Sequence, residues 1–254
     1  MDLSFQLYSA RNFLPWDGVV SRLAELGYSQ VEGFGGVFGD PDGFAALLAG
    51  AGLTMPTAHF SVTAMETDFD ASIALAHTLG VKAIFCPYLD ADQRPGDVAG
   101  WRAFAKRLAA IGEKVKGAEL AFGWHNHDFE FQALAGGDQP QTIILEEAPD
   151  IDWEADIAWI VRGGDDPLSW IDRYGSRITA VHVKDIAPAG ECVDEDGWED
   201  VGHGTMDWRQ ILRQLHSKSA VRYLVMEHDN PSDFNRFAGR SIEAVRSMEE
   251  TQNA

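Results

Sequence analysis

The sequence predicts an α/β protein, a (β/α)8 barrel formed as a single domain over residues 1–254. The length of 254 residues is close to the ~250 residues typical of such a barrel. Short apolar runs alternate with segments of helical periodicity, which is typical of repeated βα units around a parallel sheet. Four of the later runs end on histidine or carboxylate side chains, and the carboxyl ends of barrel strands meet on the face where active sites lie.

The elements follow one another in the order that such a barrel requires. Eight apolar runs have the length and composition of buried strands, namely residues 3–8, 29–34, 55–61, 81–88, 119–127, 151–157, 178–184 and 222–227. Each is followed by an amphipathic stretch that predicts a crossover helix, namely residues 15–26, 41–52, 69–79, 97–117, 139–147, 166–174, 206–217 and 232–250. Gly27, Gly52 and Gly80 end three of these stretches, as helix C-termini often require. The fifth helix has the weakest pattern. No linker or low-complexity tract divides the chain.

Composition and charge limit the classes of partner. Hydrophobic residues make up 45% of the chain and charged residues 24%, which is enough apolar material for a large core. The chain carries 40 acidic and 20 basic side chains, so its formal net charge is −20. Because this charge repels a phosphate backbone, we expect no nucleic acid partner.

The cellular compartment is predicted from the N-terminal residues and the cysteines. Residues 1–18 have neither a basic n-region nor a long apolar stretch, so we expect no signal peptide and no membrane span. Cys86 and Cys192 form neither a CxxC pair nor a disulfide framework. These features favour a cytoplasmic protein. The oligomeric state is open, with a homo-oligomer among the alternatives.

The fifth strand ends on a cluster of polar residues. Alternation along the strand places His125 and His127 on one face and Asn126 on the other, and Glu130 follows just beyond. Three polar groups at one strand end indicate a functional site. The alternative is that one ring bonds a backbone carbonyl and the other is solvated.

The sixth strand carries three carboxylates on one face. Asp152, Glu154 and Asp156 cannot all point into an apolar barrel without partners. Asp156 lies nearest the carboxyl end and is the predicted metal ligand. Asp152 and Glu154 are expected lower in the strand or outside it, solvated or in salt bridges.

The last two strands repeat the pattern. On the seventh, His182 and Lys184 share a face after a β-branched run. On the eighth, Glu227 follows Leu-Val-Met and shares a face with Asp229. A carboxylate in that position is costly to bury unless it is paired or bound to metal. His182 and Glu227 are therefore further predicted ligands.

A metal site is predicted from Glu130, Asp156, His182 and Glu227. Three carboxylates and one imidazole form a hard, oxygen-rich ligand set, which favours Mn²⁺ first and admits Mg²⁺, Co²⁺ or Zn²⁺. Such an ion can bind the adjacent carbonyl and hydroxyl oxygens of a sugar and stabilise an enediolate.

Proton transfer is expected from the carboxylates beside that metal. Glu130 and Glu227 are the predicted catalytic pair, acting on a carbon next to a carbonyl. His125, His127 and Lys184 are expected to position hydroxyls or to stabilise the oxyanion.

Two earlier strands supply further candidates. Glu32 lies on the second strand and His59 on the third, and both point by position to the same mouth, where we expect them to bind substrate. Each can instead be a structural hydrogen-bonding residue. Residues 201–208 predict a loop that leads into a helix capped by Asp207, with His203 on the surface.

Six segments together resemble the sugar phosphate isomerase/epimerase family, the xylose isomerase-like TIM barrels. They are LGYSQVE (26–32), HNHDFEF (125–131), DIAWIVRGGDDP (156–167), VHVKD (181–185), VGHGTMDW (201–208) and MEHD (226–229). The resemblance covers almost the whole chain, and its order is specific for the superfamily and not for one reaction.

The resemblance implies a divalent metal held by residues after strands five to eight, which fall on Glu130, Asp156, His182 and Glu227. Relatives with a glutamate inside the fifth strand place it earlier, where this chain has Gly123, Trp124 and His125. The fifth-strand ligand is therefore left open between Glu130 and a histidine at 125 or 127.

The resemblance implies an isomerase or epimerase of carbohydrate metabolism that acts on a small-molecule carbohydrate. It also includes dehydratases and lyases of keto-inositols, dehydroshikimate and 3-keto-glycosides. A three-zinc DNA endonuclease is disfavoured by the charge of −20. A non-catalytic sugar-binding barrel is disfavoured by carboxylates on both sides of the metal. No glycine-rich phosphate cradle or arginine cluster follows the last two strands, so a neutral keto-sugar, keto-glycoside or cyclic polyol is favoured over a sugar phosphate.

Overall fold

The strands close into a parallel barrel in the computed structural model, which describes residues 3–252. The barrel order is β1-β10-β7-β6-β5-β4-β3-β2. Its strands are β1 (Leu3–Gln6), β2 (Gln30–Gly33), β3 (Thr54–His59), β4 (Ala83–Cys86), β5 (Ala121–His125), β6 (Asp152–Asp156), β7 (Ile178–Val183) and β10 (Tyr223–Met226). The predicted (β/α)8 barrel is therefore confirmed. Residues 1–2 and 253–254 of the expected domain lie outside the described residues.

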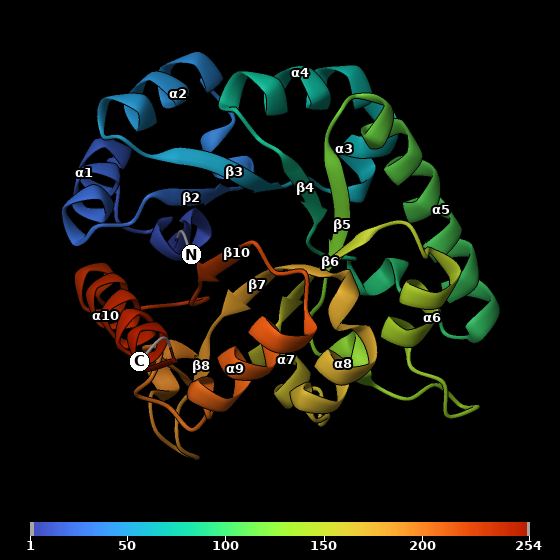
Figure 1. Cartoon of the computed structure of the whole chain (residues 1–254). Coiled ribbons are helices and arrows are strands. Elements are labelled where there is room, and N and C mark those ends of the chain that lie inside the picture. The colour runs from blue at the N-terminus through green and yellow to red at the C-terminus, as the bar shows by residue number, and fades with distance from the viewer. Residues whose placement is uncertain (1–2, 253–254) are drawn as a thin grey trace.

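The predicted helices form a ring outside the strands (Figure 1). They are α1 (Trp16–Leu26), α2 (Pro41–Gly50), α4 (Phe69–Leu79), α5 (Val98–Gly117), α6 (Pro140–Glu147), α8 (Pro167–Tyr174), α9 (Trp208–Lys218) and α10 (Phe234–Gln252). The weakly patterned fifth helix exists as α6. None of the helices within residues 3–252 is both long and apolar enough to cross a membrane.

Several short elements were not predicted from the sequence. Two are the helices α3 (Val62–Thr67) and α7 (Ile157–Arg162), and two are the antiparallel strands β8 (Asp185–Ile186) and β9 (Trp198–Glu199). Short 3-10 turns are η1 (Leu7–Ala10), η2 (Gly35–Val37), η3 (Ala91–Gln93), η4 (Phe129–Phe131), η5 (Gly175–Arg177) and η6 (Val193–Glu195). Because α3, α7 and β8 each follow the carboxyl end of a barrel strand, they build up the mouth of the barrel.

The strand register brings the chemical residues level with one another. His125 on β5 pairs with Glu154 on β6, and Asp156 on β6 pairs with His182 on β7. On the other side of the barrel, Glu32 on β2 pairs with Gln6 on β1. The register therefore places these polar side chains at similar heights near the carboxyl ends of the strands.

Gly123 on β5 is required by close packing inside the barrel. A Cβ at this position would lie 2.6 Å from the Asp152 carbonyl oxygen and 2.6 Å from the Phe85 ring. Phe85 is fully buried, and its ring occupies the space that the glycine leaves. A larger residue at 123 would have to displace backbone.

We predict that Gly123→Ala lowers the free energy of unfolding by about 1–3 kcal/mol, the usual cost of overpacking a core. Urea denaturation followed by circular dichroism measures this loss. Gly18→Ala is the matched control, because Gly18 lies in α1 with no atom within 4 Å of its added Cβ. The control should be neutral or stabilising, since alanine favours a helix over glycine by about 1 kcal/mol. Equal stability of the two variants would contradict the packing argument.

Candidate metal and catalytic site

A cavity of about 660 Å³ opens at the carboxyl ends of the barrel strands. Six predicted or neighbouring polar residues line it, namely His59, His125, His127, His182, Glu227 and Asp229. They come from β3, β5, β7, β10 and the segments that directly follow these strands. The cavity thus occupies the end of the barrel at which the polar strand ends meet.

Asp156, His182 and Glu227 bring one ligand atom each to a common point. These three atoms lie within 4.8 Å of one another, and all three residues are buried. His182 Nδ1 is 3.8 Å from Asp156 Oδ2 and 3.9 Å from Glu227 Oε2. Atoms bound to one ion at about 2.0–2.2 Å lie roughly 3.0–3.5 Å apart, so small movements would place these three around a cation.

All three ligand atoms are without hydrogen-bond partners among residues 3–252, although Glu227 Oε2 forms a 2.7 Å ion pair with Lys184 Nζ. Asp156 Oδ1 accepts a 2.9 Å hydrogen bond from the Trp159 amide and so caps α7, whereas Asp156 Oδ2 accepts none. His182 Nδ1 also has no hydrogen-bond partner. Buried polar atoms are nearly always satisfied, so three ligand atoms that face one another without hydrogen-bond partners fit a bound cation.

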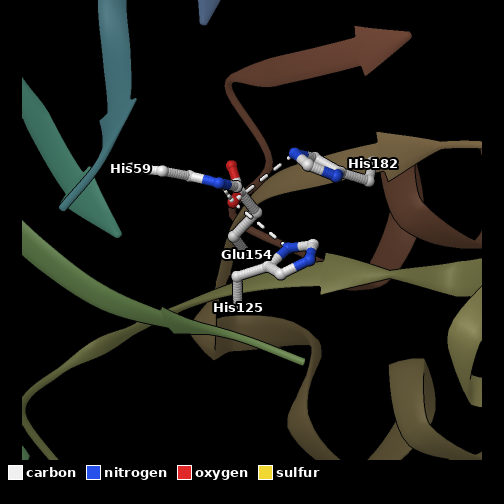
Figure 2. A group of neighbouring side chains, drawn as sticks. All are labelled: His59, His125, Glu154 and His182. Atoms are coloured by element: carbon white, nitrogen blue, oxygen red, sulfur yellow. Dashed lines mark hydrogen bonds and ion pairs between the residues drawn. The ribbon is translucent and has the colours of Figure 1, made fainter. Parts of the chain in front are cut away.

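A second cluster surrounds the other nitrogen of His182. Figure 2 shows His59, His125 and His182 turned toward Glu154. Glu154 Oε2 lies 2.6 Å from His59 Nε2, 3.3 Å from His125 Nδ1 and 3.5 Å from His182 Nε2. This cluster also has the composition of a metal site. However, 2.6 Å is closer than two ligands of one ion usually approach, so His59 and Glu154 are hydrogen-bonded to each other directly.

The position of Glu154 corrects a prediction. We expected it lower in the strand or outside the barrel, but it is fully buried and contacts three histidines. The reason is long-range: β3, β5 and β7 supply the rings that make an inward carboxylate tolerable. Asp152, in contrast, begins β6 at the opposite end of the strand from the cavity.

Glu32 completes the second cluster. Its Oε1 lies 2.7 Å from His182 Nε2 and 3.2 Å from His59 Nε2, and it accepts a 2.7 Å hydrogen bond from Gln6 Nε2. Burial opposes ionisation of Glu32, but His59 and His182 outweigh it and hold its pKa well below the ordinary value. Burial likewise disfavours charged rings, yet Glu32 and Glu154 raise the pKa of His59 to about 10 and that of His182 to about 9. A cation at His182 Nδ1 would therefore compete with a proton.

Lys184 is buried against three carboxylates. Its Nζ lies 2.7 Å from Glu227 Oε2 and 3.8 Å from Asp156 Oδ2, and it donates a hydrogen bond to Asp229. Burial opposes the ammonium charge, but Asp229, Glu227 and Asp156 outweigh it and raise the pKa of Lys184. Lys184 does not line the cavity. It acts as a fixed positive charge behind the ligand carboxylates.

Glu130 does not lie with the other three predicted metal ligands. After β5 the chain turns into η4, and Glu130 folds back onto the strand. Its oxygens accept hydrogen bonds from Trp124 Nε1 at 3.0 Å and from the His127 amide at 2.9 Å. Burial raises the pKa of Glu130 to about 8. In this position it holds the turn after β5 in place, and it faces neither Glu227 nor the cavity.

The expected substrate-binding residues fall into two groups. His59, His125 and His127 line the cavity, whereas Glu32 and Lys184 are buried behind it. Burial lowers the pKa of His125 and lowers that of His127 to about 3, so both rings are neutral. Sequence reasoning missed Gln6 and Trp159, which also line the cavity, because neither residue type stands out at a strand end.

The loop residues behave as expected. His203 is exposed, and Asp207 caps α9 by accepting a 3.0 Å hydrogen bond from the Gln210 amide.

Residues 20–250 match the family model of the xylose isomerase-like TIM barrel. The chain belongs to this family. No curated protein matches this xylose isomerase-like barrel in sequence.

Solved structures share its fold at low sequence identity. A sugar phosphate isomerase/epimerase from Parabacteroides distasonis is 20% identical, with a TM-score of 0.80 over 96% of this chain and 93% of that chain. A probable 3-DHS dehydratase, AsbF, from Bacillus anthracis is 14% identical, with a TM-score of 0.77 over 97% of this chain and 99% of that chain. An IolI protein with a bound zinc atom is 13% identical, with a TM-score of 0.78 over 99% of this chain and 97% of that chain. Proteins described as a sugar phosphate isomerase/epimerase and as a probable dehydratase therefore share the fold of this chain.

We predict that Lys184→Met lowers the free energy of unfolding by about 3–5 kcal/mol at pH 7, because it leaves buried carboxylates without their counter-charge. Lys218→Met, which removes an exposed ion pair with Asp172, should cost at most about 1 kcal/mol. Urea denaturation measures both.

The loss in free energy of unfolding caused by Lys184→Met should become smaller as the pH falls. Burial, followed by the charge of Asp229, already raises the pKa of Glu227 to about 7, and removing Lys184 raises it further. A carboxyl whose folded pKa lies above its unfolded value takes up protons on folding, so acid favours the folded variant. If Lys184→Met lost no stability at pH 7, or lost more at pH 5 than at pH 7, Lys184 would not be the counter-charge of these carboxylates.

Proposed function

We propose that the protein is a divalent-metal-dependent isomerase or epimerase of a keto-sugar or related polyol, acting by proton abstraction next to a carbonyl. The observation that carries this proposal is the convergence of Asp156, His182 and Glu227 on one buried point beside the cavity. Membership of the family supports the enzyme class.

Asp156, His182 and Glu227 would hold the metal. Two carboxylates and one imidazole suit Mn²⁺, with Mg²⁺, Co²⁺ or Zn²⁺ as alternatives, and one fold neighbour was solved with zinc. When bound, the ion would supply Lewis acidity that polarises a substrate carbonyl. Glu130 is not carried into the proposed ligand set, because its two oxygens are already hydrogen-bonded elsewhere.

Glu227 is the proposed base. It lines the cavity, and burial together with the charge of Asp229 raises its pKa to about 7. Because Glu227 offers one ligand atom to the metal, its other carboxylate oxygen can take and return a proton. The neutral rings of His125 and His127 line the same cavity and can hydrogen-bond sugar hydroxyls.

The outcome depends on the substrate. Return of the proton to the neighbouring carbon of the enediolate gives isomerisation, and protonation of the original carbon on its opposite face gives epimerisation. If the carbon next to the carbanion carries a leaving group, the same abstraction gives elimination, as in a lyase or dehydratase. AsbF, a fold neighbour, is a probable dehydratase. A non-catalytic sugar-binding barrel would bind the same ligands without exchanging a proton.

We place the enzyme in the cytoplasm, because Cys86 and Cys192 are both free thiols.

We predict that His182→Ala lowers metal content and activity together, with metal affinity reduced at least tenfold, because one of three ligands is lost. Equilibrium dialysis against Mn²⁺ followed by elemental analysis measures the affinity. His77→Ala, an exposed substitution on α4, is the control and should bind as the wild type does. Stoichiometric metal with unchanged affinity in His182→Ala would remove this residue from the ligand set.

We predict that Glu227→Gln slows proton exchange by about 10²–10⁴-fold, the usual contribution of a general base. The experiment incubates the Mn²⁺-loaded protein with candidate keto-sugars in D₂O and follows deuterium at the carbon next to the carbonyl by NMR. Glu243→Gln on the exposed face of α10 is the control. Wild-type turnover in Glu227→Gln, or no deuterium uptake at that carbon with the true substrate, would rule out the proton-transfer mechanism.

A further inference from the structure

The cavity continues past the histidines into a second, apolar part. We call this part the apolar arm and define it by Phe34, Phe38, Phe60, Ala64, Ala71 and Leu75, all of which line the cavity. These residues flank η2 after β2, follow β3, or lie on α3 and α4. In the barrel order, β2 and β3 lie across from β6 and β7, which carry Asp156 and His182. The arm and the ligand cluster are therefore opposite ends of one continuous space.

The walls of the arm are built from aromatic rings that are already ordered. Phe38 and Phe60 stack with centroids 4.8 Å apart and planes at 28°. Phe34 is held edge-on by Tyr8 at 5.5 Å and by Trp16 at 6.1 Å. Such rings offer flat faces and edges to a further ring.

Polar groups are scarce in the arm. Ser61, Ser72 and Tyr8, which packs against Phe34, supply the hydroxyls on this side of the cavity. The Ser61 oxygen already accepts a 3.1 Å hydrogen bond from the Ala64 amide as the cap of α3. A sugar ring placed here would leave most of its hydroxyls without partners, which is unfavourable in a desolvated site.

The size of the cavity leads to the same conclusion. Its 660 Å³ lie in the middle of the ~300–1,000 Å³ range of sites for drug-sized ligands. A lone hexose, with twelve non-hydrogen atoms, would occupy only the histidine end. The apolar arm would then be left facing water.

Resting on the proposed function, we propose that the substrate is a keto-sugar or keto-polyol that carries a flat apolar ring as a substituent. The sugar part lies against His125, His127 and Glu227, and the ring lies in the apolar arm. Phe38 and Phe60 present their faces to that ring, and Ala71 on α4 bounds it from the other side.

Binding of two matched probes tests this inference without relying on turnover. Isothermal titration calorimetry compares methyl and phenyl β-glucopyranoside with the full chain, in Mn²⁺ and in EDTA. The phenyl glycoside should bind on the order of ten- to a hundredfold more tightly, since it buries the additional ring carbons. Equal affinities, or no binding of either probe at millimolar concentration, would overturn the inference.

A variant that fills the arm locates the ring. Ala71→Trp should reduce the phenyl preference to within about threefold while leaving the methyl glycoside affinity unchanged. Ala74→Trp lies on the same helix but does not line the cavity, so it should keep the full preference. Circular dichroism checks that both variants fold. A phenyl preference that survives in Ala71→Trp would place the ring elsewhere and overturn the inference.

The two proposals fail separately. If the phenyl preference depends on Ala71 but no keto-sugar exchanges a proton in D₂O, the apolar arm stands and the isomerase proposal fails. If keto-sugars exchange a proton but the two glycosides bind equally, the isomerase proposal stands and the apolar arm is not a ring subsite.

Discussion

The charge balance inside the barrel mouth governs the rest of this site. Five carboxylates gather there, namely Glu32, Glu154, Asp156, Glu227 and Asp229. Three basic groups face them with raised pKa values, namely His59, His182 and Lys184. Full ionisation would leave two negative charges unmatched, which a buried site does not tolerate. The alternatives are protonated carboxyls, in line with the raised pKa of Asp156, Glu154 and Glu227, or one divalent cation.

His182 divides these charges into two sets. Its Nε2 lies 2.7 Å from Glu32, in a set whose rings and carboxylates pair closely with one another. Its Nδ1 faces Asp156 and Glu227, where partners are missing among the described residues. The first set fixes the ring, and the second set is left able to bind an ion. This is the usual relation between a metal-binding histidine and the carboxylate that orients it.

Much of this arrangement could be predicted from sequence, and the exceptions have physical causes. The eight strands were predicted because apolar runs and turn residues are local signals. The convergence of Asp156, His182 and Glu227 could be predicted because a polar residue at the end of such a run is also a local signal. Glu130 was misplaced in space because the turn of η4 after β5 depends on hydrogen bonds to Trp124 and His127. Glu154 was expected lower in the strand or outside it, and its buried site among the histidines was missed because these partners come from distant strands. The helices α3 and α7 are too short to show a period.

Above all, we propose that Asp156, His182 and Glu227 hold a divalent cation. Anomalous diffraction from a crystal grown with Mn²⁺ tests it most directly. We expect one strong peak about 2.0–2.3 Å from His182 Nδ1 and from one oxygen each of Asp156 and Glu227. A peak on the Nε2 side of His182, among Glu32, His59 and Glu154, or no peak at the barrel mouth, would contradict it.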